Sequence, residues 1–101
     1  MIKYEKEYKL MLDTWGEEPQ IDMCIEEMAE LTQALCKYKR NKRAKRTDNE
    51  NLENVQEEIA DVLHCVNQMS FLFGEDAVNT VMEKKLERTL KKLEGKKTPT
   101  C

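Results

Sequence analysis

Two acidic pairs with the same spacing recur in this chain. Glu27 and Glu30 lie in "IEEMAEL", and Glu58 and Asp61 lie in "QEEIADV". Residues three apart are neighbours on a helix surface, so each pair places two carboxylates side by side. Two such helices packed antiparallel bring four carboxylates together, where they repel one another and lose hydration. All-oxygen ligands suit hard divalent cations, so the pattern predicts a site for Mg²⁺ or Mn²⁺.

Each acidic pair lies between apolar positions, beside a longer apolar stripe on the same predicted helix. Met23 and Ala34 flank the first pair, and Cys65 follows the second. The longer stripes have the spacing of a helix face that packs in a core, and they consist of Ile21, Cys24, Ile25, Met28, Leu31, Leu35 and Tyr38, and of Leu52, Val55, Ile59, Val62, Leu63 and Val66. The acids are therefore expected at the edge of the core. A solvated or partner-facing acidic surface is the alternative.

Histidine and cysteine add little chemistry to this pattern. A di-iron bundle needs Glu-x-x-His on two helices, whereas His64 is the only histidine. We expect His64 to point away from the acids, as an ordinary surface side chain. The four cysteines, Cys24, Cys36, Cys65 and Cys101, form no CxxC motif. Three of them fall in apolar helical runs and are expected to be buried thiols.

The elements that must position these residues are four helices, an all-α fold. They are expected over residues 2–13, 18–40, 50–72 and 75–94, joined into a four-helix bundle that spans residues 1–95, with a loose tail at 96–101. Gly16 and Pro19 separate the first two helices, because glycine commonly ends a helix and proline suits its first turn. Asp48 or Asn49 is expected to cap the third helix, and Gly95 to end the fourth.

Composition limits the classes of function. The chain has 101 residues, enough for one domain, and a net charge of −3, which argues against a nucleic-acid binder. No apolar run approaches the roughly 20 residues of a membrane span, and no apolar leader begins the sequence, so we expect a cytoplasmic protein. A chain this short buries a modest fraction of its surface. Together with helices that are apolar on two sides, this predicts a homodimer or homotetramer.

The fourth predicted helix carries a lysine within its apolar face. That face consists of Val78, Val81, Met82, Leu86, Thr89 and Leu93, with Lys85 among them and Arg88 at its edge. A lysine in such a place either extends its amine to water or pairs with an anion. The anion is either the acidic cluster, as a purely structural partner, or phosphate oxygens of a substrate, which would make Lys85 and Arg88 binding residues.

These motifs resemble those of the MazG-like, all-α nucleoside triphosphate pyrophosphohydrolases. The superfamily pattern is E-x-x-E, a spacer, then E-x-x-D, and here it reads Glu27-Met-Ala-Glu30 and Glu58-Ile-Ala-Asp61, with "KLER" at 85–88 similar to a basic element of the last helix. The resemblance covers about residues 15–88. It implies a four-helix protomer that forms a dimer or dimer of dimers, with Mg²⁺ bound by Glu27, Glu30, Glu58 and Asp61.

The resemblance also implies a reaction. Such enzymes split a nucleoside triphosphate into the monophosphate and pyrophosphate, often to cleanse the nucleotide pool. A carboxylate of the motif such as Glu27, or Glu26 beside it, is then the expected general base. Trp15 is a candidate to stack on the base of the substrate, although core packing is the commoner use of such a residue.

A basic segment leaves a second class of function open. Seven lysines and arginines occur between Lys37 and Arg46. They are interpreted as a solvated helix end and loop, as a surface that attracts triphosphate, or, least of all, as a nucleic-acid contact. In the rival class, the protein is a non-enzymatic helical interaction module whose basic segment holds a partner and whose acids form only ion pairs.

Overall fold

The computed structural model describes residues 3–46 and 49–96, and these form four helices without a strand. The helices are α1 (Glu5–Trp15), α2 (Glu17–Arg43), α3 (Asn49–Phe73) and α4 (Glu75–Lys96). Each expected helix is present, and the all-α prediction is confirmed. The expected cap at Asp48, the start of the first helix at Ile2 and the tail beyond Lys96 lie outside the described residues.

The glycines at two of the predicted helix ends behave differently. Gly16 ends α1, with φ of 91° and its N–H donating to the carbonyl oxygen of Leu12 at 2.9 Å. A side chain would strain that backbone. Gly95 is the next-to-last residue of α4, which is described as far as Lys96, so the helix continues one residue beyond the predicted stop.

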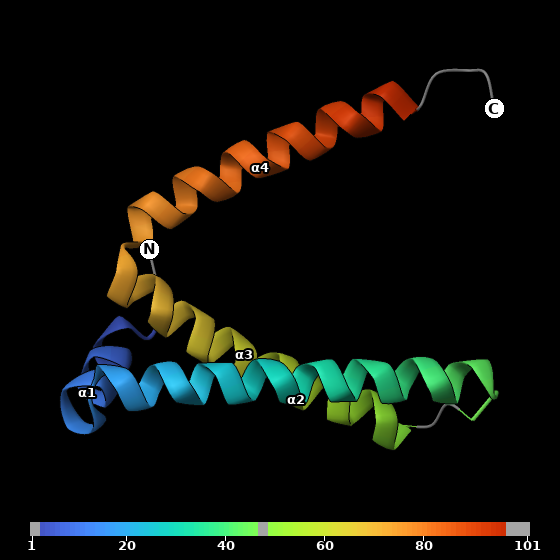
Figure 1. The fold of residues 1–101 in the computed structure, drawn as a ribbon, viewed down its shortest axis with the longest axis horizontal. Helices are drawn as coiled ribbons and strands as arrows, with labels where there is room; N and C mark the ends of the chain where they lie inside the picture. The colour runs from blue at the N-terminus through green and yellow to red at the C-terminus, as the bar shows by residue number, and fades with distance from the viewer. Residues whose placement is uncertain (1–2, 47–48, 97–101) are drawn as a thin grey trace.

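The long helices α2 and α3 pack antiparallel, and α1 crosses one end of the pair and contacts both (Figure 1). Their shared interior is made mostly of small and polar side chains. The buried residues are Tyr8, Gln20, Cys24, Ala34, Asn51, Cys65 and Gln68. This interior holds α1, α2 and α3 as one unit and sets how closely the acid-bearing helices approach.

The apolar stripes predicted as the core lie largely at the surface of the chain. Ile25 is 57 % exposed and Leu63 is 56 % exposed, and Met28, Leu35, Leu52, Ile59 and Val66 are exposed as well. The prediction is wrong for these residues, although Cys24, which belongs to the stripe of α2, is buried as expected. The helices α2 and α3 meet through the sides that carry Cys24 and Cys65, so most of each stripe flanks the contact between the helices instead of filling it.

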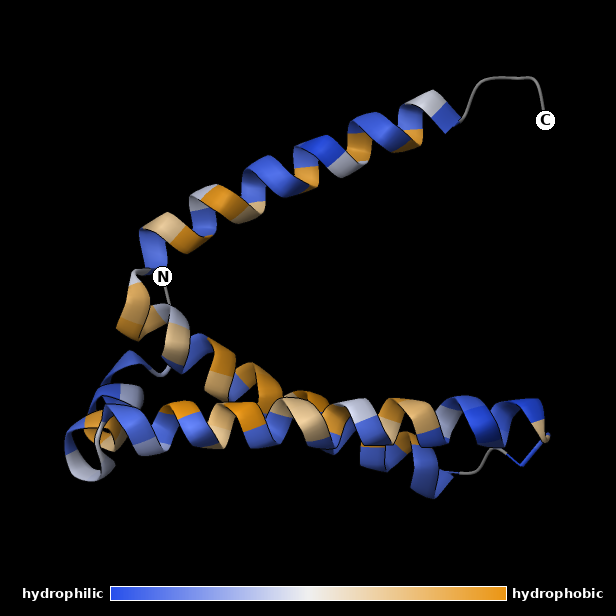
Figure 2. Ribbon diagram, viewed as in Figure 1, coloured by the Kyte–Doolittle hydropathy of each residue, from blue (hydrophilic) through white to orange (hydrophobic). Residues whose placement is uncertain are grey.

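The helix α4 projects away from the other three (Figure 1). It follows Gly74, whose φ is 117°, and in the described part of the chain it contacts only α3. Its apolar side chains are mixed with hydrophilic ones along the whole arm (Figure 2) and remain exposed, namely Val78, Val81, Met82, Leu86, Leu90 and Leu93. Four helices are thus present, but α4 does not close over α2 and α3 within one chain.

Among the described residues, no helix combines the length and the apolar character that crossing a membrane requires.

Candidate metal centre and adjoining cavity

Three of the four predicted metal ligands converge between α2 and α3. Glu27, Glu58 and Asp61 each offer a carboxylate oxygen, and these oxygens lie within 4.8 Å of one another. The antiparallel packing produces this arrangement, because the i, i+3 pair of one helix meets the i, i+3 pair of the other. The acidic motifs that recur in the sequence therefore meet in space.

The electrostatics place Glu30 beside this group. Burial raises the pKa of Glu27 above its ordinary value, and the negative charges of Glu30, Asp61 and Glu58 raise it further. Burial likewise raises the pKa of Glu58, with added contributions from Glu30, Asp61 and Glu57. Glu30 thus acts on a glutamate of each helix, so all four carboxylates of the motif belong to one cluster, which we call the acidic cluster.

The acidic cluster lacks internal compensation. The Oε2 atoms of Glu27 and Glu58 are buried without a hydrogen-bond partner among the described residues. Every charge that shifts the pKa of these two carboxyls is negative. An unsatisfied buried polar group costs about 1–3 kcal/mol, and more when it is charged. Carboxylate oxygens crowded in this way suit Mg²⁺ or Mn²⁺, which would supply the missing positive charge.

Only some of the other predicted site residues lie near the acidic cluster. Glu26 is exposed and stands outside the group of converging oxygens, next to Glu27. Trp15 is 58 % exposed and lines a cavity that also contains Glu27 and Asp61. Lys85 and Arg88 are exposed on α4, where the neighbours of Lys85 come from α4 itself. Because α4 projects away from the other helices after its start near Gly74 (Figure 1), one chain does not bring these two basic residues to the acids.

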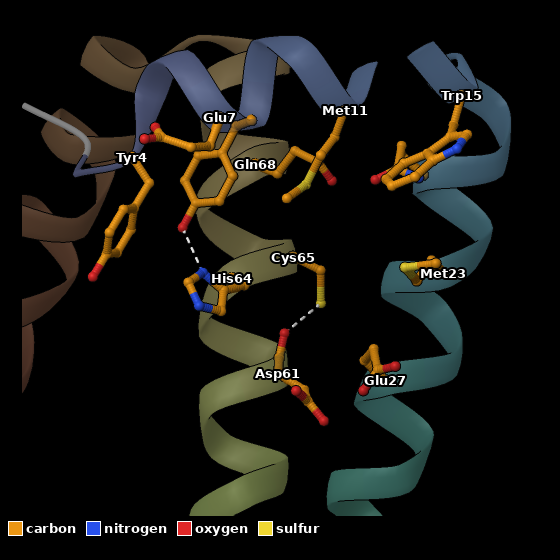
Figure 3. Close-up of a pocket in the computed structure, with 12 residues that line it drawn as sticks. Tyr4, Glu7, Met11, Trp15, Met23, Glu27, Asp61, His64, Cys65 and Gln68 are labelled. Carbon is orange, nitrogen blue, oxygen red and sulfur yellow. Dashed lines mark hydrogen bonds between the residues drawn. The ribbon is translucent and has the colours of Figure 1, made fainter. Parts of the chain in front are cut away.

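A cavity of about 440 Å³ adjoins the acidic cluster. Figure 3 shows Glu27 and Asp61 on facing helices at one end of the cavity, and Gln68 beneath α1 at the other. The cavity is lined by Tyr4, Glu7, Tyr8, Met11, Trp15, Gln20, Met23, Glu27, Asp61, His64, Cys65 and Gln68. The helix α1 therefore serves as a wall of a space that opens beside the acids.

The structure gives His64 a role that differs from the expected one. Its Nδ1 and the hydroxyl of Tyr8 form a hydrogen bond of 2.9 Å, and the side chain lines the cavity. Tyr8 is only 1 % exposed. In the sequence of α3 alone, nothing covers the side that carries His64, but in the structure α1 crosses that side. The spacing of Asp61, Cys65 and Gln68, which places them on one face of α3, was the sequence pattern that indicated the α3 wall of the cavity.

Gln68, which the motif search missed, is 3 % exposed, and its Nε2 has no hydrogen-bond partner among the described residues. Buried amide groups are normally hydrogen-bonded. This donor lies at the end of the cavity opposite the acids (Figure 3). A glutamine within an apolar helical run carries no sequence signal that separates such a donor from a surface residue.

The cysteines are mostly structural. Cys24 and Cys65 are buried as expected, whereas Cys36 is exposed, which corrects the prediction for that residue; Cys101 lies outside the described residues. Burial raises the pKa of the Cys65 thiol to about 12, with Cys24 as the next cause. A thiol with so high a pKa carries almost no thiolate at neutral pH, so it packs as a small apolar group.

Comparisons with protein families, with curated proteins and with solved structures found no match for this chain. The candidate site therefore rests on its own geometry: an uncompensated acidic cluster beside a largely apolar cavity.

Proposed function

We propose that this protein is a Mg²⁺-dependent nucleoside triphosphate pyrophosphohydrolase that releases the nucleoside monophosphate and pyrophosphate. The observation that carries the proposal is the convergence of Glu27, Glu58 and Asp61, with two buried carboxylate oxygens that lack a hydrogen-bond partner among the described residues. The resemblance of the two acidic motifs to MazG-like enzymes supplies the reaction. A role in cleansing the cytoplasmic nucleotide pool follows from the same resemblance.

The protein side chains have distinct roles in this proposal. Glu27, Glu30, Glu58 and Asp61 hold the metal through their carboxylate oxygens. When bound, the metal neutralises phosphate charge and lowers the pKa of water in the site. Glu26 or Glu27 would accept the proton of the attacking water.

The exposed apolar faces support a homodimer or homotetramer as the working form. The stripe with Ile59 and Leu63 on α3, the stripe with Ile25 on α2, and the arm α4 all present large apolar side chains to solvent. Exposed apolar patches of this extent commonly mark protein interfaces. In such an assembly, α4 of one chain would pack on a second chain, with Lys85 and Arg88 near the phosphate oxygens held at that chain's acidic cluster.

A panel of nucleoside triphosphates with Mg²⁺ tests the reaction. The products are separated by ion-exchange chromatography, which distinguishes monophosphate plus pyrophosphate from diphosphate plus phosphate. We expect the first pair of products and none without a divalent cation. Release of diphosphate, or the same rate in the presence of a chelator, would contradict the proposal.

A non-enzymatic interaction module is the second candidate. The observation in its favour is the helix α4, whose apolar side chains remain exposed, together with the basic residues that end α2. A module of this kind needs no metal. Its thermal stability would therefore be indifferent to Mg²⁺, whereas that of the enzyme would rise, because a ligand that binds only the folded state stabilises it.

A further inference from the structure

The cavity has a charged end and a neutral end. Glu27 and Asp61 line it at the acidic cluster, and Gln68 lines it at the other end. Gln68 lies seven positions after Asp61 on α3, which is about 10 Å along the helix axis at the rise of an α-helix. A ligand anchored by phosphate at the acidic cluster would thus place its distant part against Gln68.

The walls between these ends suit a flat ring. Trp15 contributes an aromatic surface, and Met11 and Met23 contribute thioethers on α1 and α2 (Figure 3). The ring of Tyr4, which also lines the cavity, lies against His64. Aromatic side chains stack on planar heterocycles, and methionine adapts its shape to ring edges. A heteroaromatic base therefore fits these walls better than a sugar or a peptide does.

Gln68 supplies a hydrogen-bond donor at the neutral end. Its side chain is 3 % exposed, and its Nε2 lacks a partner in the described part of the chain. The nearby hydroxyl of Tyr8 and Nδ1 of His64 are already bonded to each other. An unpaired N–H needs an acceptor, and a carbonyl oxygen on a bound ring is such an acceptor.

We propose that this cavity binds the base of the nucleotide and that Gln68 Nε2 donates a hydrogen bond to a carbonyl oxygen on the edge of that base. The protein consequently prefers bases that carry an oxo group to otherwise similar bases that carry an amino group. This inference rests on the proposed function for the phosphate end of the ligand. The base end is testable without hydrolysis.

Two pairs of triphosphates of matched size provide the kinetic test. Hypoxanthine and adenine differ at the 6 position, and uracil and cytosine at the 4 position, in each case by oxo against amino. We expect kcat/KM to favour the oxo member of at least one pair by about 3- to 10-fold, the worth of one neutral hydrogen bond. Gln68→Leu should reduce that ratio to near one. Gln56→Leu, at an exposed position of α3 outside the cavity, should preserve it.

Nucleosides provide the test that needs neither phosphate nor metal. Inosine against adenosine, and uridine against cytidine, are compared by their shift of the thermal unfolding temperature. The nucleoside with the oxo base should stabilise the wild type more, and this difference should vanish in Gln68→Leu. If that variant does not fold, Gln68→Met keeps the approximate size of the side chain and removes the donor, so it should lose the preference as well.

The outcomes separate the two proposals. Triphosphate cleavage without discrimination in either pair, or a preference that survives both Gln68 variants, overturns the role of Gln68 and leaves the hydrolase intact. Selective binding of inosine or uridine by a protein that cleaves no triphosphate supports the cavity and overturns the proposed reaction. Absence of nucleoside selectivity in the folded wild type overturns the inference directly.

Discussion

The two sides of the α2–α3 pair differ: one lacks positive charge to balance its carboxylates, and the other lacks a surface to cover its apolar side chains. One side holds the acidic cluster, where carboxylates crowd together and two of their oxygens have no hydrogen-bond partner in the part of the chain that the structure describes. The other carries apolar side chains such as Ile59 and Leu63, which remain exposed. A single antiparallel contact thus leaves unbalanced charge on one side and uncovered apolar surface on the other. In the proposed function, a cation would correct the first kind of deficit and another protein surface the second.

The largest expected effect is on the acidic side. Glu58→Gln removes one charge from the cluster while keeping the shape of the side chain. We expect kcat/KM to fall by at least about 100-fold, since even residues that only support metal ligands are commonly worth about 10- to 100-fold. The fold should persist, because the change relieves repulsion. Hydrolysis assays and circular dichroism of the same preparation measure both effects.

Glu53→Gln is the matched control for this variant, because Glu53 is an exposed acid on α3 outside the cluster. It should retain wild-type kinetics. Wild-type kinetics in Glu58→Gln itself would remove the metal site from the proposal.

The next effect is on the apolar side. Leu63→Lys places a charge in the exposed stripe of α3 and should weaken self-association by at least about 30-fold, the loss expected at an energetically important interface position. Sedimentation over a range of concentrations measures it. Gln33→Lys, an exposed position on α2 outside the apolar stripe, should leave assembly unchanged. A wild type that remains monomeric at micromolar concentration would refute the oligomer.

The arm α4 connects the two sides in the proposed assembly. Lys85→Met preserves the apolar part of the side chain and removes its charge, so we expect kcat/KM to fall by about 10- to 100-fold, the worth of a hydrogen bond to a charged group. The unfolding temperature should change little. Lys84→Met on the same helix is the control. If Lys85→Met lowers stability and leaves the kinetics unchanged, Lys85 is a structural residue.

The smallest effect is the dependence of stability on pH. The folded protein holds the pKa values of Glu27 and Glu58 above the ordinary 4.5. Between the ordinary and the raised pKa the folded state binds more protons than the unfolded state, so stability falls as pH rises through this window. Without divalent metal, calorimetry should therefore give a higher unfolding temperature in mildly acidic than in neutral buffer.

Saturating Mg²⁺ should reverse this trend, because metal binds the ionised carboxylates and competes with protons. The double variant Glu27→Gln with Glu58→Gln should lose the pH dependence that comes from these residues. A trend of the same size in the double variant would assign it to other groups.

Part of this organisation was predictable from the sequence. Apolar periodicity located the four helices, and Gly16 marked the first turn correctly. The repeated i, i+3 spacing predicted that Glu27, Glu58 and Asp61 would meet, since helix geometry alone dictates which side they share. These features follow from the local geometry of the backbone, which the residues of a short segment determine by themselves.

Other features depend on how helices pack, and the sequence did not reveal them. Ile25 and Leu63 have the spacing of core residues, but the smaller Cys24 and Cys65 allow the helices to approach on their own sides instead. The role of His64 depends on α1 crossing α3, because its hydrogen-bond partner Tyr8 lies 56 positions away in the sequence. The direction of α4 depends on the turn at Gly74, and a glycine permits several directions without selecting one.

The small side chains between α2 and α3 also have a consequence for ion size. Cys24, Ala34 and Cys65 are among the few buried residues of the pair, and packed helices normally lie about 8–10 Å apart according to the side chains between them. Small side chains between the helices favour the short end of that range of interhelical distances. The distance between the carboxylates of the two helices is therefore set by residues that would not themselves contact a bound cation. A bulkier side chain at one of these positions would widen the candidate site and favour a larger cation.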